Sequence, residues 1–175
     1  MPISPAWDAG QAVLACPIRS WSGEVSRFHS NRYDATDPGG SLRYPGRYHR
    51  DWPTLYTCIR PEASIGEFLR HSTPSALSRL AVMRLSTLSV RLEAVLNCRD
   101  AATMGIDPEA LLHDTDYDLT QAIGEAALAR GVEGILVPSA TRLGDNLILW
   151  MAQIRPGSQI SIVRSEDPRL YVPRP

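Results

Sequence analysis

The sequence contains no lysine, so all 18 of its Lys and Arg positions are arginine. Against 19 acidic residues they leave a formal net charge of -1. A broad cationic surface, which nonspecific nucleic-acid binding requires, is therefore not expected. Arginine carries a rigid fork of donors that binds phosphate or carboxylate in pairs of hydrogen bonds. The charge balance predicts no direct nucleic-acid binding, but it leaves specific recognition of a phosphate open.

Long apolar runs and metal-binding patterns are also missing. No stretch approaches the ~18 apolar residues of a membrane span, and Met1–Ser4 lacks the basic segment of a secretion signal. Cys16, Cys58 and Cys98 are widely spaced, and neither they nor the 4 histidines show zinc-ligand spacing. We therefore predict a soluble, cytoplasmic protein with buried free thiols, without a membrane anchor and without a metal.

Several familiar catalytic signatures are absent as well. There is no P-loop and no GxGxxG, and no GxSxG surrounds Ser139. These absences argue against a P-loop nucleotide hydrolase, a Rossmann dehydrogenase and an α/β hydrolase. We find no internal repeat, and 175 residues are typical of one domain, so residues 1–175 are predicted to form one.

Short alternating segments outnumber helical ones. Residues 24–29 alternate, which places Val25 and Arg27 on one face of a strand and Phe28 on the other. Residues 80–85 and 88–92 predict two further strands, and Asp118 to Gln121 has the pattern of a helix capping box. Because strands and helices do not alternate regularly, we predict an α+β fold with a mixed, mainly antiparallel β core and flanking helices.

Three positions carry groups that could act on a ligand. Arg47 lies in the loop of residues 30–53, Glu67 lies on a helix beginning at Pro61 among small residues, and Ser139 follows a strand. Each has an ordinary alternative: a solvated loop arginine, a surface glutamate and a turn serine. Together with the rings of Tyr48 and Tyr56, these residues indicate a ligand that contains phosphate and a flat ring.

The order of short motifs along the chain resembles the RES domain family, over roughly residues 24–152. The motifs are Ser26–Phe28, Gly46–His49, Leu55–Thr57, Ile65–Leu69, Val137–Ser139 and Gly144–Trp150. The chain departs from the family pattern at Pro45, where a glycine is common, at Tyr48, where tryptophan is usual, and at His49, where asparagine is frequent.

The resemblance implies a fold similar to ADP-ribosyltransferase toxins and a role as the toxin of a bacterial type II toxin–antitoxin pair. Such toxins consume NAD by hydrolysis or phosphorolysis of the nicotinamide–ribose bond. The implied partner is an Xre-type helix-turn-helix antitoxin that covers the active site, with a homodimer possible inside the complex. A mono-ADP-ribosyltransferase that modifies a protein and a nonenzymatic nucleotide-binding domain remain as alternatives.

The resemblance also implies roles for particular residues, with NAD as substrate and no cofactor. Glu67 would stabilise the cationic sugar, and Ser139 would bind the ribose or the nicotinamide amide. Arg27 and Arg47 would hold the diphosphate. The predicted catalytic residues are Glu67, Arg27 and Ser139, and the predicted substrate-binding residues are Arg47, Tyr48, Tyr56 and Asn146.

Overall fold

The computed structural model describes residues 7–70, 80–113 and 115–171. Its strands are β1 (Ile18–Ser30), β2 (Thr54–Cys58), β3 (Met83–Asn97), β4 (Gly134–Pro138), β5 (Asp145–Trp150) and β6 (Gln159–Glu166). Its α-helices are α1 (Ala9–Leu14), α2 (Pro61–Arg70) and α3 (Asp118–Ala129). Short 3-10 helices lie at Ala101–Met104, Pro108–Leu112, Met151–Gln153 and Pro168–Leu170.

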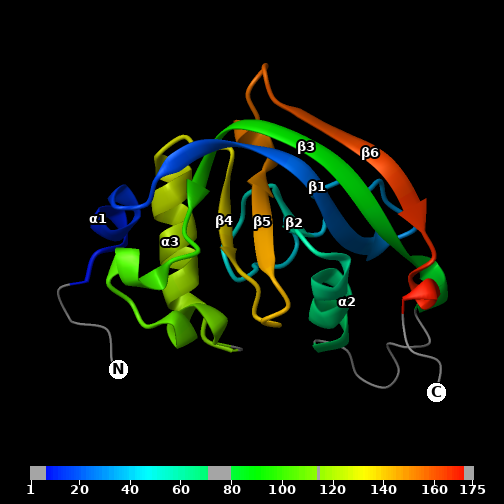
Figure 1. The fold of residues 1–175 in the computed structure, drawn as a ribbon, viewed down its shortest axis with the longest axis horizontal. Helices are drawn as coiled ribbons and strands as arrows, with labels where there is room; N and C mark the ends of the chain where they lie inside the picture. The colour runs from blue at the N-terminus through cyan, green and yellow to red at the C-terminus, as the bar shows by residue number, and fades with distance from the viewer. Residues whose placement is uncertain (1–6, 71–79, 114, 172–175) are drawn as a thin grey trace.

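The strands form one sheet that closes on itself. The order is β1-β2-β5-β4-β3-β6, and β1 also pairs with β3, so five strands complete a ring and β6 lies outside β3. In Figure 1 the long strands β1, β3 and β6 arch over the shorter β2, β5 and β4. Only the β3–β4 pairing is parallel within the described sheet. The predicted α+β fold with a mixed, mainly antiparallel core is confirmed.

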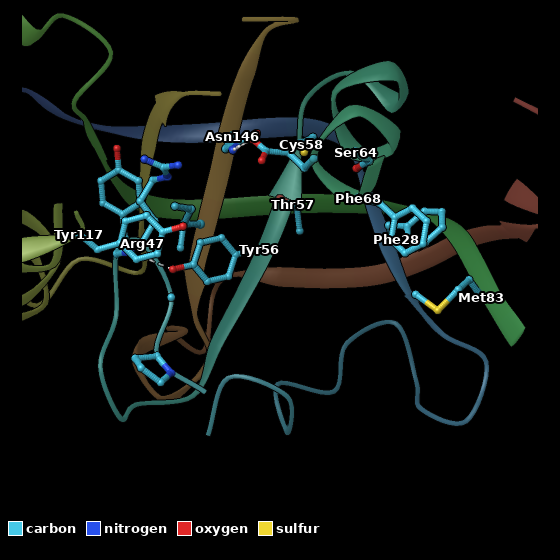
Figure 2. A pocket seen from close by; sticks show the side chains of 15 residues that line it. Phe28, Arg47, Tyr56, Thr57, Cys58, Ser64, Phe68, Met83, Tyr117 and Asn146 are labelled. Atoms are coloured by element: carbon cyan, nitrogen blue, oxygen red, sulfur yellow. Dashed lines mark hydrogen bonds between the residues drawn. The ribbon is translucent and has the colours of Figure 1, made fainter. Parts of the chain in front are cut away.

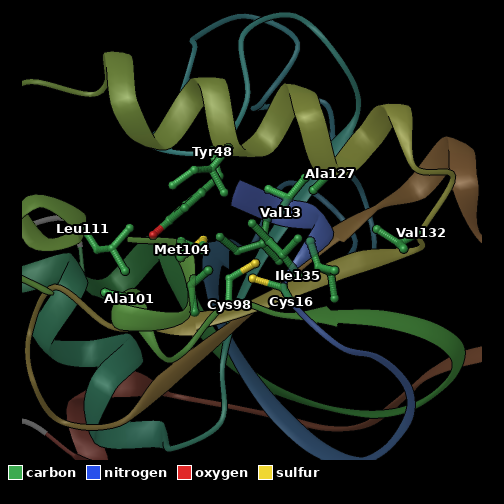
Figure 3. Close-up of a cluster of buried hydrophobic side chains, with 14 of the residues drawn as sticks. Val13, Cys16, Tyr48, Cys98, Ala101, Met104, Leu111, Ala127, Val132 and Ile135 are labelled. Atoms are coloured by element: carbon green, nitrogen blue, oxygen red, sulfur yellow. The ribbon is translucent and has the colours of Figure 1, made fainter. Parts of the chain in front are cut away.

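Two hydrophobic clusters lie on the two faces of this sheet, because successive strand side chains point to opposite faces. The inner cluster takes one or more residues from each strand of the ring, among them Val25, Leu55, Leu88, Leu136 and Leu147. The outer cluster joins residues of β4 and β5 to the helices α1 and α3, as Figure 3 shows. The inner cluster closes the ring, and the outer one attaches the helical layer to it.

Two local predictions were wrong. Residues 83–97 form one continuous strand, β3, where the sequence pattern predicts two. The predicted capping box does not form, since Tyr117 is the N-cap of α3 and Asp118 is already helical. The side chain of Gln121 instead donates to the carbonyl of Gly46 at 2.9 Å. Both differences arise from tertiary contacts. Neighbouring strands hold β3 on both edges, and the side chain of Gln121 is bonded to Gly46 in the loop of residues 30–53.

Candidate active site

A pocket of about 470 Å³ opens on the outer side of β2 and β5. It lies between α2 on one side and the segment of residues 45–48 with Tyr117 on the other, as Figure 2 shows. Its volume falls in the range of pockets that hold small molecules. Of the predicted site residues, it is lined by Arg47, Tyr48, Tyr56, Glu67 and Asn146.

Glu67 is fixed in this pocket by two side chains from the β4–β5 hairpin. The hydroxyl of Ser139 donates to Oε1 of Glu67 at 2.8 Å, and the amide of Asn146 donates to the same oxygen at 3.3 Å. The register of β4 and β5 places Val137 opposite Asn146, so the two donors leave the strands close together. Three predicted residues that are far apart in sequence thus meet at one carboxylate.

Gly66 explains how α2 comes so close to the hairpin. A Cβ atom on Gly66 would lie 3.2 Å from side-chain carbons of Thr141 and Leu143, which is tighter than ordinary contact. Ser139 itself is 1% exposed and is not among the residues that line the pocket. The serine therefore stands behind Glu67 and holds it, in contrast to the predicted direct contact with the ribose or the amide.

Arg47 is held at the opposite edge of the pocket. Its Nη1 donates to the carbonyls of Leu111 at 3.2 Å and of His113. Its guanidinium carbon lies 4.9 Å from the centroid of the Tyr117 ring, within the range of a cation–π contact. Both of these hydrogen bonds use Nη1, and Nε and Nη2 have no hydrogen-bond partner among the described residues.

The loop that carries Arg47 is anchored through Tyr56. The hydroxyl of Tyr56 accepts from the backbone N–H of Tyr48 at 2.9 Å and lies 2.9 Å from Nδ1 of His49. Burial raises the pKa of Tyr56, so the group remains a hydroxyl. The ring of Tyr56 lines the pocket, while its oxygen holds the loop.

Tyr48 lines the pocket but is almost completely buried. It is 1% exposed, and Figure 3 shows its ring in the outer cluster beneath α3. Gly124 of α3 makes this possible, because a Cβ there would lie 2.1 Å from the carbonyl oxygen of Tyr48. The ring therefore packs in the core beside the pocket, and the contact of Tyr48 with the substrate stays a prediction.

Arg27 lies on the other face of β1 from the pocket. Its guanidinium donates to the carbonyls of Ala35 and Asp37, the latter at 2.8 Å. Burial is the main reason why its pKa is lowered to about 10, which leaves it charged at neutral pH. Strand alternation puts Arg27 on the side of Val25 and turns Phe28 toward the pocket. A direct bond from Arg27 to a ligand in this pocket does not fit that arrangement.

The pocket has an aromatic wall that the motifs did not indicate. The rings of Phe28 and Phe68 lie 4.3 Å apart between centroids, with 30° between their planes. Met83 lies beside them in Figure 2, and Tyr117 faces Arg47. Because side chains alternate along β1, Phe28 and Arg27 point to opposite faces, and this pattern in the sequence could have identified Phe28 as a pocket residue. Phe68, Met83 and Tyr117 come together only through tertiary packing.

The described residues contain no group of three or more His, Cys, Asp or Glu side chains that could hold a metal ion. Across the same residues, none of the helices has the length and apolar character to cross a membrane.

Comparison with known proteins identifies the family. A sequence model of the RES domain matches residues 24–172, which extends past residue 152 through β6. The chain is 30% identical over 184 aligned residues to the NAD(+) phosphorylase MbcT of Mycobacterium tuberculosis and of Mycobacterium bovis, covering 97% of each protein. The crystal structure of the M. tuberculosis MbcT–MbcA toxin–antitoxin complex matches with a TM-score of 0.79 and 27% identity, over 93% of this chain and 94% of that one. The chain therefore belongs to the RES domain family.

Proposed function

We propose that this protein is the toxin of a bacterial toxin–antitoxin pair and degrades NAD by breaking the bond between nicotinamide and ribose. The observation that carries the proposal is the carboxylate of Glu67, fixed by Ser139 and Asn146 in a pocket with aromatic walls. The similarity to MbcT, an NAD(+) phosphorylase, supports the same chemistry.

Glu67 acts on the sugar. In NAD the nicotinamide ring is cationic, so it departs as a neutral molecule when it takes both electrons of the C–N bond. The ribose left behind gains positive charge, which a fixed carboxylate stabilises more strongly than it stabilises the ground state. Since Oε1 of Glu67 already receives two hydrogen bonds, the carboxylate is oriented before the substrate arrives.

Phosphate is the proposed acceptor. An oxygen of inorganic phosphate forms a bond to C1 of the ribose as the C–N bond breaks, and the products are nicotinamide and ADP-ribose phosphorylated at C1. The name of the MbcT relatives supports this acceptor over water. Arg47, with Nε and Nη2 unpaired among the described residues, binds a phosphate of the substrate.

Asn146 orients both the carboxylate and the substrate. Its amide nitrogen donates to Glu67, while its Oδ1 is buried without a hydrogen-bond partner in the described part of the chain. A buried acceptor of this kind is costly unless a ligand satisfies it. We assign to Oδ1 a hydrogen bond from the ribose or from the carboxamide of nicotinamide.

Arg27, Ser139 and Tyr56 are positioning residues in this proposal. Arg27 holds the start of the loop that leads to Arg47, Ser139 holds Glu67, and Tyr56 fixes the backbone of Tyr48. The rings of Phe28 and Phe68 offer a flat apolar surface to a ring of the substrate.

Product analysis tests the function. The purified chain is incubated with NAD, with and without inorganic phosphate, and the products are identified by mass spectrometry. We expect nicotinamide and the C1 phosphate of ADP-ribose, at a rate that rises with phosphate. ADP-ribose formed equally without phosphate would identify water as the acceptor. Label transferred to protein would identify an ADP-ribosyltransferase, and binding without release of nicotinamide would identify a nonenzymatic domain.

We further propose an Xre-type helix-turn-helix antitoxin as the partner, bound over the pocket, in an assembly that contains a homodimer of this chain. The MbcT–MbcA complex supports an antitoxin partner. An NAD-degrading toxin acts where the NAD pool lies, which favours the cytoplasm. Co-expression with a cognate helix-turn-helix antitoxin is expected to restore growth and to abolish NAD loss. Growth arrest that persists with a co-purifying partner would contradict a partner that covers the pocket.

A further inference from the structure

Two of the three cysteines lie directly opposite each other in the outer cluster. Cys16 is 2% exposed and Cys98 is 0% exposed. Ile18 of β1 pairs with Leu96 of β3, and one step further the N–H of Asn97 donates to the carbonyl of Pro17 at 2.9 Å. One more step along this antiparallel register places Cys16 opposite Cys98. Figure 3 shows their sulfur atoms next to each other.

The backbone geometry of this pair suits a disulfide. Residues 17 and 97 are joined by a hydrogen bond, and Cys16 and Cys98 come next on the two segments, just before β1 begins, where the N–H of Cys16 donates to the carbonyl of Val13 at 3.1 Å. One step beyond a hydrogen-bonded pair, a regular antiparallel ladder holds Cα atoms about 4.5 Å apart, and disulfides span about 4.4–6.8 Å between Cα atoms. The two segments that carry Cys16 and Cys98 therefore need little movement to be joined by a disulfide.

The two thiols also interact before any bond forms. A hydrogen bond from Cys98 is the main cause that lowers the pKa of Cys16, and the positive charge of Arg130 adds to it. The same hydrogen bond, together with burial, raises the pKa of Cys98. Arg130 is held in place because its guanidinium donates to the carbonyl of Val13. Of the two, Cys16 is the better nucleophile at neutral pH.

We propose that Cys16 and Cys98 are a site of oxidative modification, at which a small-molecule disulfide converts them into a cross-strand disulfide. The thiolate of Cys16 attacks one sulfur of the oxidant and releases the first thiolate. The thiolate of Cys98 then attacks the sulfur of Cys16 and releases the second. The two protons from the cysteines go to the two released thiolates, so the oxidant is reduced to two thiols.

The place of Cys16 in the fold determines how the oxidant reaches its thiol and how the disulfide affects stability. It comes just after α1, a helix of 6 residues at the start of the described chain, and a local opening there exposes the thiol without unfolding the sheet. The closed disulfide ties the segment before β1 to the end of β3 and restricts the unfolded chain. We expect the midpoint of thermal unfolding to rise by about 5–10 °C.

Oxidation of the purified full chain with oxidised glutathione, followed by alkylation and peptide mapping without reduction, tests the site. We expect one intramolecular link, between Cys16 and Cys98, and its loss in Cys16→Ala and in Cys98→Ala. Cys58→Ala is the matched control: Cys58 is also buried, but burial raises its pKa to about 12, and its side-chain partner is Ser64. That variant should form the link as the parent does.

Three results would overturn the proposal. One is a stable glutathione adduct on Cys16 that is not displaced by Cys98. Another is preferential oxidation of Cys58. The third is the absence of any linked peptide even in mild urea that opens α1. Should the alanine variants fail to fold, Cys16→Ser and the peptide map of the parent chain still decide the question.

Discussion

Glu133 and Glu67 are both at least partly buried, but the fold uses their carboxylates for different purposes. Glu133, just before β4, is 0% exposed. Its carboxylate accepts backbone N–H groups of Glu93, Ala94 and Arg155 at 2.7, 2.8 and 2.9 Å. Glu67 on α2 is only partly buried, and the side chains of Ser139 and Asn146 donate to its Oε1.

The kind of donor distinguishes the two roles. Backbone donors from three separate positions make Glu133 a junction between β3 and the turn before β6, which is a structural task. Side-chain donors hold Glu67 at a pocket that a ligand can enter. Removing Glu133 should therefore impair folding and spare the chemistry, whereas removing Glu67 should do the reverse.

The largest effect is expected for Glu67→Gln. The variant keeps the size of the side chain but removes the negative charge that stabilises the ribose cation, so kcat for NAD consumption should fall roughly 10²–10³-fold. Nicotinamide release under saturating NAD measures this.

Glu62→Gln is the matched control, since Glu62 lies on the same helix with 64% of its side chain exposed beside Arg60. Its activity should stay within about twofold of the parent. An active Glu67→Gln protein would remove Glu67 from the chemistry.

Glu133→Gln should have the converse effect. The amide retains one acceptor oxygen, but it turns N–H groups toward buried backbone donors, and unpaired buried donors cost about 1–3 kcal/mol each. We expect the free energy of unfolding in urea to fall by roughly 3 kcal/mol, with kcat per folded molecule unchanged.

Glu125→Gln serves as control, because Glu125 pairs with Arg50 at the surface, where the two side chains are 47% and 50% exposed. Exposed pairs contribute about 0–1 kcal/mol. Equal losses in the two variants would mean that the backbone donors of Glu133 contribute little.

The sequence pattern indicated a role for Glu67 but none for Glu133. Glu67 stood in a motif and was predicted as the acting carboxylate. Glu133 carried no signal, because its partners are backbone groups up to 40 positions away that no side-chain pattern encodes. The strand that follows Glu133 was predictable from its apolar run, since that depends on local residue type.

What could not be predicted was the direction of individual side chains in the long loop. Tyr48 and Arg47 are neighbours, and only the close approach at Gly124 turns the tyrosine into the core. Ser139 and Glu67 were predicted to share one site and are hydrogen-bonded to each other, but the burial of Ser139 behind the carboxylate depends on the contact between α2 and the β4–β5 hairpin. Such contacts are set by packing between distant segments.

Ser139→Ala tests whether the hydrogen bond from Ser139 holds Glu67 in place, and its expected effect is smaller. The change removes the 2.8 Å hydrogen bond to Oε1 of Glu67 and leaves the one that the Asn146 amide donates to the same oxygen. We expect kcat to fall roughly 10-fold while KM changes little, because a misplaced catalytic group lowers the rate more than binding. Steady-state kinetics on NAD provide both values. A rise in KM with kcat unchanged would instead make Ser139 a substrate contact, as the sequence alone suggested.

The smallest effect is expected for the change in unfolding free energy as the pH is lowered. Burial is the largest single influence on Glu133 and opposes its charged form, but the hydrogen bonds from Arg155, Ser158, Ala94 and Glu93 together outweigh it and lower its pKa. A carboxyl with a lowered pKa in the folded state stabilises the fold above its ordinary pKa of 4.5 and loses that contribution as the pH falls below it. The gap in unfolding free energy between the parent and Glu133→Gln should therefore be constant from pH 7 to about pH 5 and then narrow toward pH 3. Other carboxyls titrate in both proteins and cancel in the difference. A gap that stays constant into acid would show that Glu133 acts through its shape and hydrogen bonds without a contribution from its charge, and it would weaken the contrast with Glu67.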